Sequence, residues 1–264
     1  SGSNNTALIN KWYKRYKTEE YYQGAVRRAW ERISKGDNLK FIYNECYNEG
    51  VPYEVVLLAM IESSWYPHKN NHAGAAGYWQ FIPATGKAYG LVITDKRDDR
   101  LSVEKSTRAA IKYLKGLSLR YDDAKTFSDR WCFAFAAYNR GPAKVTRTFQ
   151  GAGKTFSKYP DMIPLSFSET RNYVPKMFGL RKFLQEFTEE KFIVEVYKSP
   201  ADIAYEGYVS RRADLSVSTK IKMLKAIDGM YREEIELRNY GEDRDEAYSD
   251  GALKEIASEL EDLQ

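Results

Sequence analysis

One carboxyl group follows directly after an almost wholly apolar stretch of the chain. Every side chain from Val55 to Ile61 is apolar, which predicts a helix buried on nearly all sides, and Glu62 stands on its last turn. Burying an unpaired carboxylate is costly, so a buried carboxyl group usually keeps its proton through a raised pKa. A carboxyl group that is protonated at neutral pH is a general acid. The alternative is that Glu62 points from the helix end into water.

Further polar residues that could bind a substrate stand in short blocks along the chain. Residues 70–77 are small and polar, which predicts a loop rather than a helix or strand. Gln80 then lies between Trp79 and Phe81, so its amide needs a hydrogen-bond partner, either a ligand or the backbone. The remaining candidates are Ser63, Tyr138, Asn139, Glu169 and Tyr173.

The order and spacing of these blocks resemble the lytic transglycosylases of the goose-lysozyme-like (SLT) kind, most closely the transglycosylase D branch of that family. The family's Glu-Ser pair matches residues 62–63, and its Gly-x-x-Gln-hydrophobe-x-Pro-x-Thr pattern matches residues 77–85. Its Ala-Tyr-Asn-x-Gly motif matches residues 137–141, and its Glu-Thr-x-x-Tyr-Val block matches residues 169–174. Each motif is weak alone, but four in order form a specific signal, which covers roughly residues 39–187.

This resemblance implies a peptidoglycan-cleaving enzyme that needs one catalytic carboxyl group and no cofactor. In the family a single Glu, here Glu62, protonates the oxygen that bridges N-acetylmuramic acid and N-acetylglucosamine, while the 2-acetamido group supports the oxocarbenium-like centre. The resulting carboxylate then takes the proton of the muramic C6 hydroxyl, which closes a 1,6-anhydro ring. Because no external water attacks, the second carboxylate that glycosidases normally use is unnecessary.

The resemblance also implies substrate-binding roles for the other blocks, namely for Ser63, Gln80, Tyr138, Asn139, Glu169 and Tyr173. Tyr138 is expected beside Glu62, where it orients the acid or the acetamido group, and Asn139 is expected to secure the loop. Residue chemistry leaves alternatives open. The Ser63 hydroxyl can bond a backbone carbonyl at its helix end, Tyr138 can be a core tyrosine, and Glu169 can be a first-turn glutamate favoured by the helix dipole.

Two positions depart from the family pattern. Many relatives have Leu-Met between the glycine and the glutamine, where this chain has Tyr78 and Trp79. This pair predicts an altered groove shape rather than lost chemistry. Arg140 adds a positive charge inside the Ala-Tyr-Asn-x-Gly motif, where it is suited to meet a substrate carboxylate.

Helices are the elements expected to position these residues. Apolar periodicity predicts helices over residues 5–34, 39–48, 103–119 (capped by a serine), 131–139 and 144–148. Another helix is predicted over residues 169–186, capped by Ser168, with Pro175 able to kink it or divide it. The predicted fold class is therefore mainly α, and the resemblance makes it a lysozyme-like helical domain.

The chain is expected to consist of four segments. Residues 1–3 have the composition of an expression scar, residues 4–38 form a helical extension, residues 39–187 form the catalytic domain, and residues 188–264 form an acidic, mostly helical C-terminal region. Within that last region we predict a short strand or linker over residues 192–197, then helices over residues 218–231 and 252–263. The carbohydrate-binding LysM pattern that often follows the catalytic domain in transglycosylase D relatives is absent from the sequence. We expect the region to pack on the catalytic domain; the alternative is that it docks onto an envelope protein or the cell wall.

The charges are unevenly distributed along the chain. Residues 188–264 hold 11 basic and 19 acidic residues, whereas the whole chain holds 41 and 37, so residues 1–187 carry a net charge of +12. A basic surface attracts anionic polymers, which include nucleic acid and also peptidoglycan with its peptide carboxylates. The sequence holds no recognised nucleic-acid-binding motif, so nucleic acid is not an expected partner.

Cysteine usage and hydropathy bear on disulfide bonds, metal sites and membrane-spanning segments. Cys46 and Cys132 lie in apolar surroundings and are expected to be buried free thiols, although a single bridge is compatible with the sequence. Two histidines and two cysteines without ligand spacing predict no metal site. No apolar run reaches transmembrane length. The resemblance implies the bacterial periplasm or cell envelope, with an export signal or lipid anchor expected to be missing from this sequence.

Three other functions compete with that of a lytic transglycosylase. A hydrolytic muramidase would cut the same bond with water and leave reducing ends. A non-catalytic peptidoglycan-binding scaffold would gain nothing from a desolvated acid, which argues against it. Nucleic-acid binding is suggested only by the charge distribution.

Overall fold

The computed structural model describes residues 4–70, 73–188, 199–241 and 251–264. Within these residues the elements are helices, and extended pairing is limited to three isolated β-bridges. The mainly helical fold predicted from the sequence is confirmed. The contacts divide the chain into two compact units, residues 1–192 and residues 193–264, and each unit is described by itself. The four segment boundaries given above remain predictions.

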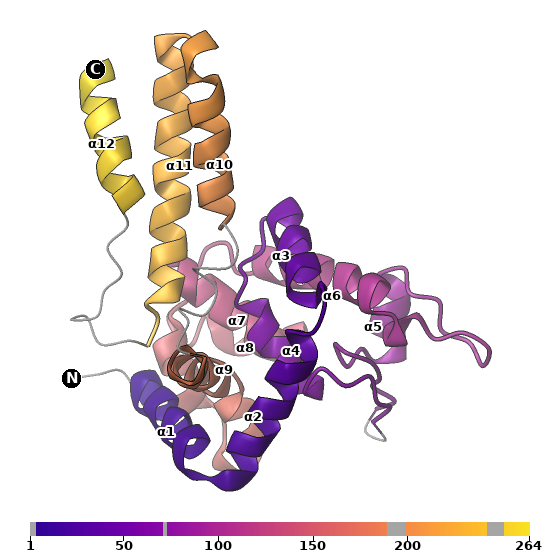
Figure 1. Cartoon of the computed structure of the whole chain (residues 1–264). Helices are drawn as coiled ribbons and strands as arrows, with labels where there is room; N and C mark the ends of the chain where they lie inside the picture. Colours follow the sequence, from indigo (N-terminus) through magenta and orange to yellow (C-terminus); the bar gives the residue numbers. More distant parts are fainter. Residues whose placement is uncertain (1–3, 71–72, 189–198, 242–250) are drawn as a thin grey trace. The chain divides into compact units, whose positions relative to one another are not determined.

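The first unit is built from helices that are mostly connected by short loops (Figure 1). In its described residues these are α1 (Asn4–Thr18), α2 (Glu20–Ile33), α3 (Asn38–Glu49), α4 (Val55–Ser63), α5 (Pro83–Ala88), α6 (Val103–Leu119), α7 (Phe127–Arg140), α8 (Pro142–Phe149) and α9 (Ser168–Phe187). Three short 3-10 helices complete it: η1 (Asp99–Leu101), η2 (Phe156–Met162) and η3 (Leu165–Phe167). The predicted serine cap of α6 is confirmed, because the Ser102 hydroxyl accepts a hydrogen bond from the backbone N–H of Lys105.

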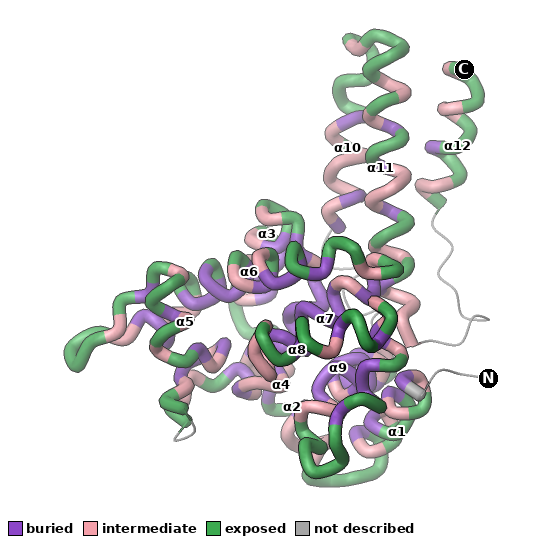
Figure 2. The backbone as a smooth tube through the Cα atoms, turned by 180° about the vertical axis from the view of Figure 1, so that it is seen from behind, coloured by how far each residue is buried: buried purple, intermediate pink, exposed green. Residues whose placement is uncertain are grey.

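The helix α4 is buried on nearly every side, as its apolar sequence predicts. Its residues from Val55 to Met60 are all buried, and it packs against α9 and α2. Figure 2 shows α4, α7 and α9 as largely buried segments. Each of these helices carries a predicted site residue near one end: Glu62 near the end of α4, Tyr138 near the end of α7, and Tyr173 in the first half of α9. A rigid core therefore positions three of the predicted site residues.

The single helix predicted over residues 5–34 is wrong, because the chain turns at Glu19 and forms α1 and α2. Glu19 has an extended backbone between them. The Tyr22 ring of α2 meets two rings of α1 edge-on, with its centroid 5.5 Å from that of Trp12 and 5.9 Å from that of Tyr16. Neither glycine nor proline marks this turn in the sequence. Aromatic packing between the two helices therefore overrides the local helical preference.

The helix α9 differs from its prediction at its start and at its proline. Ser168 is the first residue of the helix, not its cap, and no side chain caps this end. Pro175 lies inside one continuous helix of 20 residues, so it does not divide the helix. The missing N–H of Pro175 removes one backbone hydrogen bond, and the tertiary contacts of the buried helix compensate for this loss.

A glycine of α9 sets the distance at which α1 crosses it. A Cβ atom added at Gly179 would lie 2.7 Å from the Cβ of Trp12, 2.9 Å from the backbone nitrogen of Tyr13 and 3.0 Å from the carbonyl oxygen of Ile9. Two of these three atoms belong to the backbone of α1, so they move only if α1 moves. The close crossing brings Trp12 onto α9, where its indole N–H donates to the Oδ1 of Asn172 at 3.0 Å.

We expect Gly179→Ala to destabilise the first unit by about 1–3 kcal/mol, because the added methyl group pushes α1 away from α9. The midpoint of urea denaturation, followed by tryptophan fluorescence, measures this loss. Gly24→Ala is the matched control, since its Cβ would meet only the mobile end of the Arg28 side chain, at 3.1 Å. The control should be neutral or stabilising by up to about 1 kcal/mol. Equal effects of both substitutions would contradict a close-packed crossing.

The second unit contains three α-helices in its described residues: α10 (Pro200–Arg211), α11 (Val217–Arg238) and α12 (Gly251–Leu263), with the 3-10 turn η4 (Arg212–Asp214). It has its own hydrophobic core, formed by Ala201, Tyr208, Leu224, Ile227, Tyr231 and Ile256. The helix α10 was not predicted, and α11 extends beyond the predicted residues 218–231. The predicted strand or linker over residues 192–197 lies outside the described residues.

Both cysteines are buried free thiols, as expected. Among the helices that the structure describes, none combines the length and the hydropathy that crossing a membrane requires.

Candidate active site

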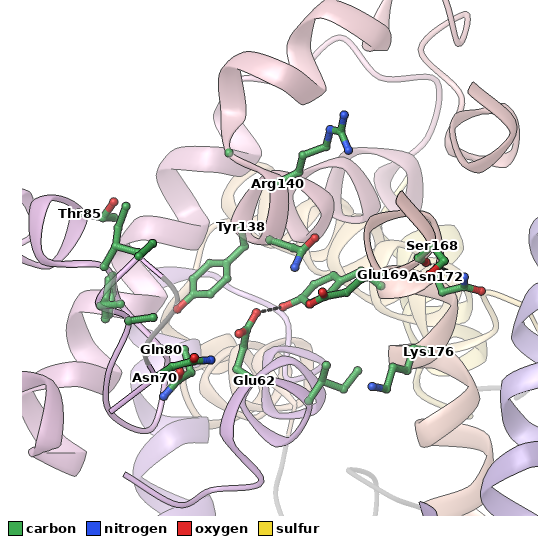
Figure 3. A pocket seen from close by; sticks show the side chains of 18 of the residues that line it. Glu62, Asn70, Gln80, Thr85, Tyr138, Arg140, Ser168, Glu169, Asn172 and Lys176 are labelled. Atoms are coloured by element: carbon green, nitrogen blue, oxygen red, sulfur yellow. Dashed lines mark hydrogen bonds between the residues drawn. The ribbon is translucent and has the colours of Figure 1, made fainter. Parts of the chain in front are cut away.

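A cleft of about 880 Å³ opens in the first unit, and Glu62 lies in its lining (Figure 3). The lining residues come from α1, α2, α4–α9 and the segment before α5, of which we call residues 73–82 the cleft loop. Of the seven residues predicted for the site, six line the cleft: Glu62, Gln80, Tyr138, Asn139, Glu169 and Tyr173. The cleft therefore brings together blocks that are more than 100 residues apart in the sequence.

The Glu62 carboxyl group is held in a poorly solvated position. Burial against the apolar helix α4 raises its pKa from 4.5 to about 7. The carboxylate of Glu169 raises this pKa further, whereas the hydroxyl of Tyr173 and the ammonium of Lys176 lower it. At neutral pH a large fraction of Glu62 is therefore protonated, and the group can either donate or accept a proton. The alternative that Glu62 points into water is wrong.

Tyr173 is the residue that orients the acid. Its hydroxyl donates a hydrogen bond of 2.5 Å to the Oε1 of Glu62 (Figure 3). Tyr138, predicted beside Glu62 to orient the acid or the acetamido group, lines the same cleft but does not bond Glu62, since its hydroxyl donates to the carbonyl oxygen of Trp79 at 2.6 Å. Tyr138 lines the cleft and holds the cleft loop, while Tyr173 stabilises the carboxylate form of the acid.

Side chains from three different helices hold four carbonyl groups of the cleft loop. The Ser63 hydroxyl donates to the carbonyl of Tyr78 at 2.6 Å, and Tyr138 holds the next carbonyl, that of Trp79. Arg100 donates to the carbonyls of Gly74 at 2.7 Å and Phe81 at 2.9 Å. Ser63 is buried and is not part of the cleft lining. Its predicted contact with the substrate is therefore replaced by the backbone bond that its position at the helix end allows.

A buried ion pair of Arg100 fixes the loop. Its guanidinium group pairs with Asp98 through two hydrogen bonds of 2.8 Å, and both side chains are almost fully buried. Such a pair is expected to stabilise the loop, because every polar atom it buries has a partner. The indole N–H of Trp79 donates to the Thr107 hydroxyl at 3.0 Å, which fixes the same loop to α6.

Gln80 presents an acceptor that has no partner in the described residues. Its backbone has a positive φ of 51°, and its Nε2 donates to the carbonyls of Gly77 at 2.8 Å and His68 at 3.1 Å. Its Oε1 is buried and accepts no hydrogen bond from the described residues. An unpaired acceptor in a cleft is suited to an N–H or O–H donor of a ligand.

One face of α9 carries four polar residues into the cleft. Glu169, Asn172, Tyr173 and Lys176 recur at helical spacing, so they lie on one side of the helix. Glu169 is exposed, and Asn139 is partly buried opposite this face. Glu169 and Tyr173 were predicted from the sequence, whereas Asn172 and Lys176 were not, although their helical spacing from Glu169 was visible there.

The N-terminal helices supply a part of the lining that was not predicted. Lys11, Trp12 and Arg15 come from α1, and Tyr22 comes from α2. Tyr113 of α6 also lines the cleft. No local signal distinguishes these residues from an ordinary apolar stripe with flanking charges. Within the described residues there is also no group of three or more His, Cys, Asp or Glu side chains that could hold a metal ion.

We expect Tyr173→Phe to shift the pH dependence of any activity that needs protonated Glu62. The tyrosine hydroxyl lowers the pKa of Glu62, so removing it raises that pKa above about 7. The loss of activity on the alkaline side then moves to higher pH, and the rate at pH 7 falls by roughly tenfold because the carboxylate form loses a charged hydrogen bond. Tyr138→Phe is the control, since its hydroxyl bonds the backbone and the alkaline limb should stay in place. The measurement is the rate against pH for both variants.

Residues 40–159 match the transglycosylase SLT domain family. This part of the chain belongs to that family, and its fold is the lysozyme-like helical fold that the resemblance implied. The chain is 34% identical over 199 residues to membrane-bound lytic murein transglycosylase D of Escherichia coli K12, an alignment covering 70% of this chain and 41% of that relative. It therefore spans less than half the length of this relative.

Two further relatives carry the same chemistry in their names. The soluble lytic murein transglycosylase of Salmonella typhimurium is 29% identical over 178 residues, which cover 66% of this chain and 25% of the relative. The peptidoglycan transglycosylase gp16 of Escherichia phage T7 is 34% identical over 135 residues, covering 50% of this chain and 9% of the relative. The resemblance noted in the sequence, to the transglycosylase D branch of the SLT family, is confirmed by these matches.

Proposed function

We propose that this chain is a peptidoglycan lytic transglycosylase in which Glu62 is the catalytic acid and base. The observation that carries the proposal is a single desolvated carboxyl group with a pKa of about 7, in a cleft lined by hydrogen-bonding side chains. The family membership of residues 40–159 and the names of the relatives support the same reaction class. The substrate bond is the β-1,4 link from N-acetylmuramic acid to N-acetylglucosamine.

The two chemical steps place opposite demands on Glu62. In the first step the protonated carboxyl group gives its proton to the bridging oxygen as the bond to the muramic C1 breaks. In the second step the carboxylate takes the proton of the muramic C6 hydroxyl, whose oxygen bonds to C1 and closes the 1,6-anhydro ring. A pKa near 7 suits both roles at neutral pH. The hydrogen bond from Tyr173 stabilises the carboxylate that exists between the two steps.

The remaining cleft residues are proposed to bind the glycan strand. The free Oε1 of Gln80 would accept a hydrogen bond from a sugar N–H or O–H group. Asn139 and Glu169 would contact further sugar hydroxyls, since both line the cleft. Arg140, whose guanidinium lies 5.0 Å from the centre of the Phe167 ring, would meet an anionic group at the rim. Tyr138 and Ser63 would act indirectly, by holding the cleft loop.

The location follows from the substrate, since peptidoglycan lies in the bacterial envelope. The names of the relatives, which are membrane-bound or soluble murein transglycosylases, support the periplasm or cell envelope. The second unit has a hydrophobic core of its own, which supports a separate role such as docking onto an envelope protein.

The position of Glu169 favours a hydrolytic muramidase as the second candidate function. Glu169 lines the same cleft as Glu62 and acts on the pKa of Glu62. A second carboxylate could hold a water molecule, which would make the enzyme a hydrolytic muramidase. Mass spectrometry of the fragments released from purified sacculi distinguishes the two reactions. Fragments with 1,6-anhydro-muramic ends support a transglycosylase, and reducing muramic ends support a muramidase. If the protein binds sacculi but releases no fragments, both proposals fail and a binding scaffold remains.

A further inference from the structure

A lysine on α9 faces the cleft without a counterion. Lys176 lines the cleft with Glu62 and Glu169, and Figure 3 shows its amino group on the side that faces Glu62. The amino group lies 5.2 Å from the centre of the Trp12 ring. Among the described residues it makes no hydrogen bond, and no carboxylate oxygen lies within 4.0 Å of it. The ammonium group therefore keeps three unused donors inside the cleft.

The other cations that line the cleft are placed differently. Arg15 is neutralised by two hydrogen bonds to Glu19, at 2.8 and 3.1 Å, and Lys11 is exposed to solvent on α1. Arg140 lies over the ring of Phe167 at the rim. Lys176 alone among these four has lost much of its water without gaining an ion-pair partner in the described residues, and this burial lowers its pKa.

The neighbours of Lys176 have already used their polar groups. The indole N–H of Trp12 donates to Asn172, and the Asn172 amide donates in turn to the carbonyl of Ser168 at 2.6 Å. Tyr173 donates to Glu62. A ligand that enters this part of the cleft therefore finds one strong donor, the ammonium of Lys176, beside the face of an indole ring.

We propose that Lys176 determines specificity by binding a carboxylate of the glycan substrate next to Glu62. The inference rests on the proposed function, because carboxylates are the anionic groups of peptidoglycan. Two sources present this group. One is the stem peptide attached to muramic acid, and the other is the lactyl carboxylate that remains where the stem has been removed.

Binding a carboxylate here also favours the first step of the reaction. In the empty cleft the positive charge of Lys176 lowers the pKa of Glu62. A bound carboxylate neutralises this charge, so the pKa of Glu62 rises and the acid keeps its proton while the substrate is bound. Recognition of the anion and protonation of the acid are therefore coupled.

Three substrates and four proteins test the proposal. The substrates are glycan strands with stem peptides, strands stripped of peptides by an amidase, and stripped strands whose lactyl carboxylates have been converted into neutral methylamides. The proteins are the parent, Lys176→Met, Lys176→Arg and Lys112→Met. The last variant removes an exposed charge of α6 that does not line the cleft, so it is the matched control. The readout is kcat/KM on each substrate.

We expect Lys176→Met to lower kcat/KM by about tenfold on a carboxylate-bearing strand and to change it much less on the methylamide strand, where only the pKa of Glu62 responds to the lost charge. A loss confined to strands with stems identifies the stem peptide as the source. A loss confined to stripped strands identifies the lactyl group, and a loss on both means that either carboxylate is bound. Lys176→Arg should recover most of the activity because it keeps the charge, and Lys112→Met should behave as the parent.

Other results overturn the proposal. An equal loss on all three substrates would mean that Lys176 acts on Glu62 or on the fold rather than on a carboxylate. The alkaline limb of the rate on methylamide strands should move to higher pH in Lys176→Met under either outcome, since the lost positive charge raises the pKa of Glu62, so the comparison of the three substrates decides. No loss on any substrate would also overturn it. If the parent cleaves none of the strands, the proposed function itself fails, and the inference falls with it.

Discussion

Replacing Glu62 with glutamine is expected to reduce cleavage of glycan strands at pH 7 by roughly 10²–10⁴-fold, because the amide has no proton to donate. The glutamine side chain has nearly the same shape and can still accept the hydrogen bond of Tyr173 through its carbonyl oxygen. Binding of sacculi should therefore persist while release of fragments stops. Activity of the variant equal to that of the parent would exclude Glu62 as the acid.

The same substitution is expected to stabilise the protein at alkaline pH. The pKa of Glu62 is raised in the folded state, from 4.5 to about 7, so the unfolded chain releases this proton at lower pH than the folded chain does. Stability therefore falls as pH rises from about 4.5 to about 7, and the loss persists above that range. Glu62→Gln removes this loss, which amounts to roughly 3 kcal/mol at pH 8. Urea denaturation of both proteins at pH 4 and pH 8 measures the difference.

Glu169→Gln is the matched control for the catalytic prediction. It removes the other carboxylate of the cleft, which is exposed rather than desolvated. We expect a change of less than about tenfold, because a solvent-exposed contact contributes little. Glu169 is also one of the groups that raise the pKa of Glu62. The alkaline limb of the pH–rate profile of Glu169→Gln should therefore move slightly to lower pH. A loss as large as that of Glu62→Gln would favour the two-carboxylate muramidase.

Gly77→Ala is expected to destabilise the first unit by about 3 kcal/mol or more and to abolish activity. Gly77 has a φ of +88°, and an added Cβ would lie only 1.9 Å from the carbonyl oxygen of Arg100. That oxygen belongs to the backbone next to the buried pair of Arg100 and Asp98, so it has little freedom to move. The clash therefore displaces the cleft loop, which carries Gln80.

Gly90→Ala separates the clash from the backbone strain. Gly90 has a similar φ of +86°, but a Cβ there meets nothing within 4 Å. Its cost should be only about 1–2 kcal/mol, the value for a left-handed residue with a side chain. Thermal or urea denaturation of both variants gives the comparison. If the two lose the same stability, the contact between Gly77 and Arg100 does not constrain the loop.

Local sequence patterns predicted the parts of the fold in which one segment decides its own structure. The apolar run of α4 predicted both a buried helix and the raised pKa of Glu62 at its end. The serine cap of α6 was equally visible. In each case the residues concerned are close in the chain, so spacing and side-chain chemistry are sufficient.

Features that depend on contacts between distant segments could not be predicted in this way. The resemblance placed Tyr138 beside Glu62, and only the packing of α9 against α4 decides that Tyr173 bonds it. The turn at Glu19 arises from ring contacts between α1 and α2. The lining supplied by Trp12 requires α1 to cross α9 at Gly179, a contact between residues more than 150 positions apart.

That crossing also has a consequence for the order in which the protein is made. Among the described helices of the first unit, α1 leaves the ribosome first and its partner α9 leaves last. Trp12 of α1 and Asn172 of α9 are 160 residues apart. At roughly 5–20 residues per second, the apolar face of α1 waits about 10–30 s for its partner. Lys176 and Tyr173 reach the cleft in that same final interval. The cleft is therefore incomplete until α9, the last helix of the first unit, has been synthesised.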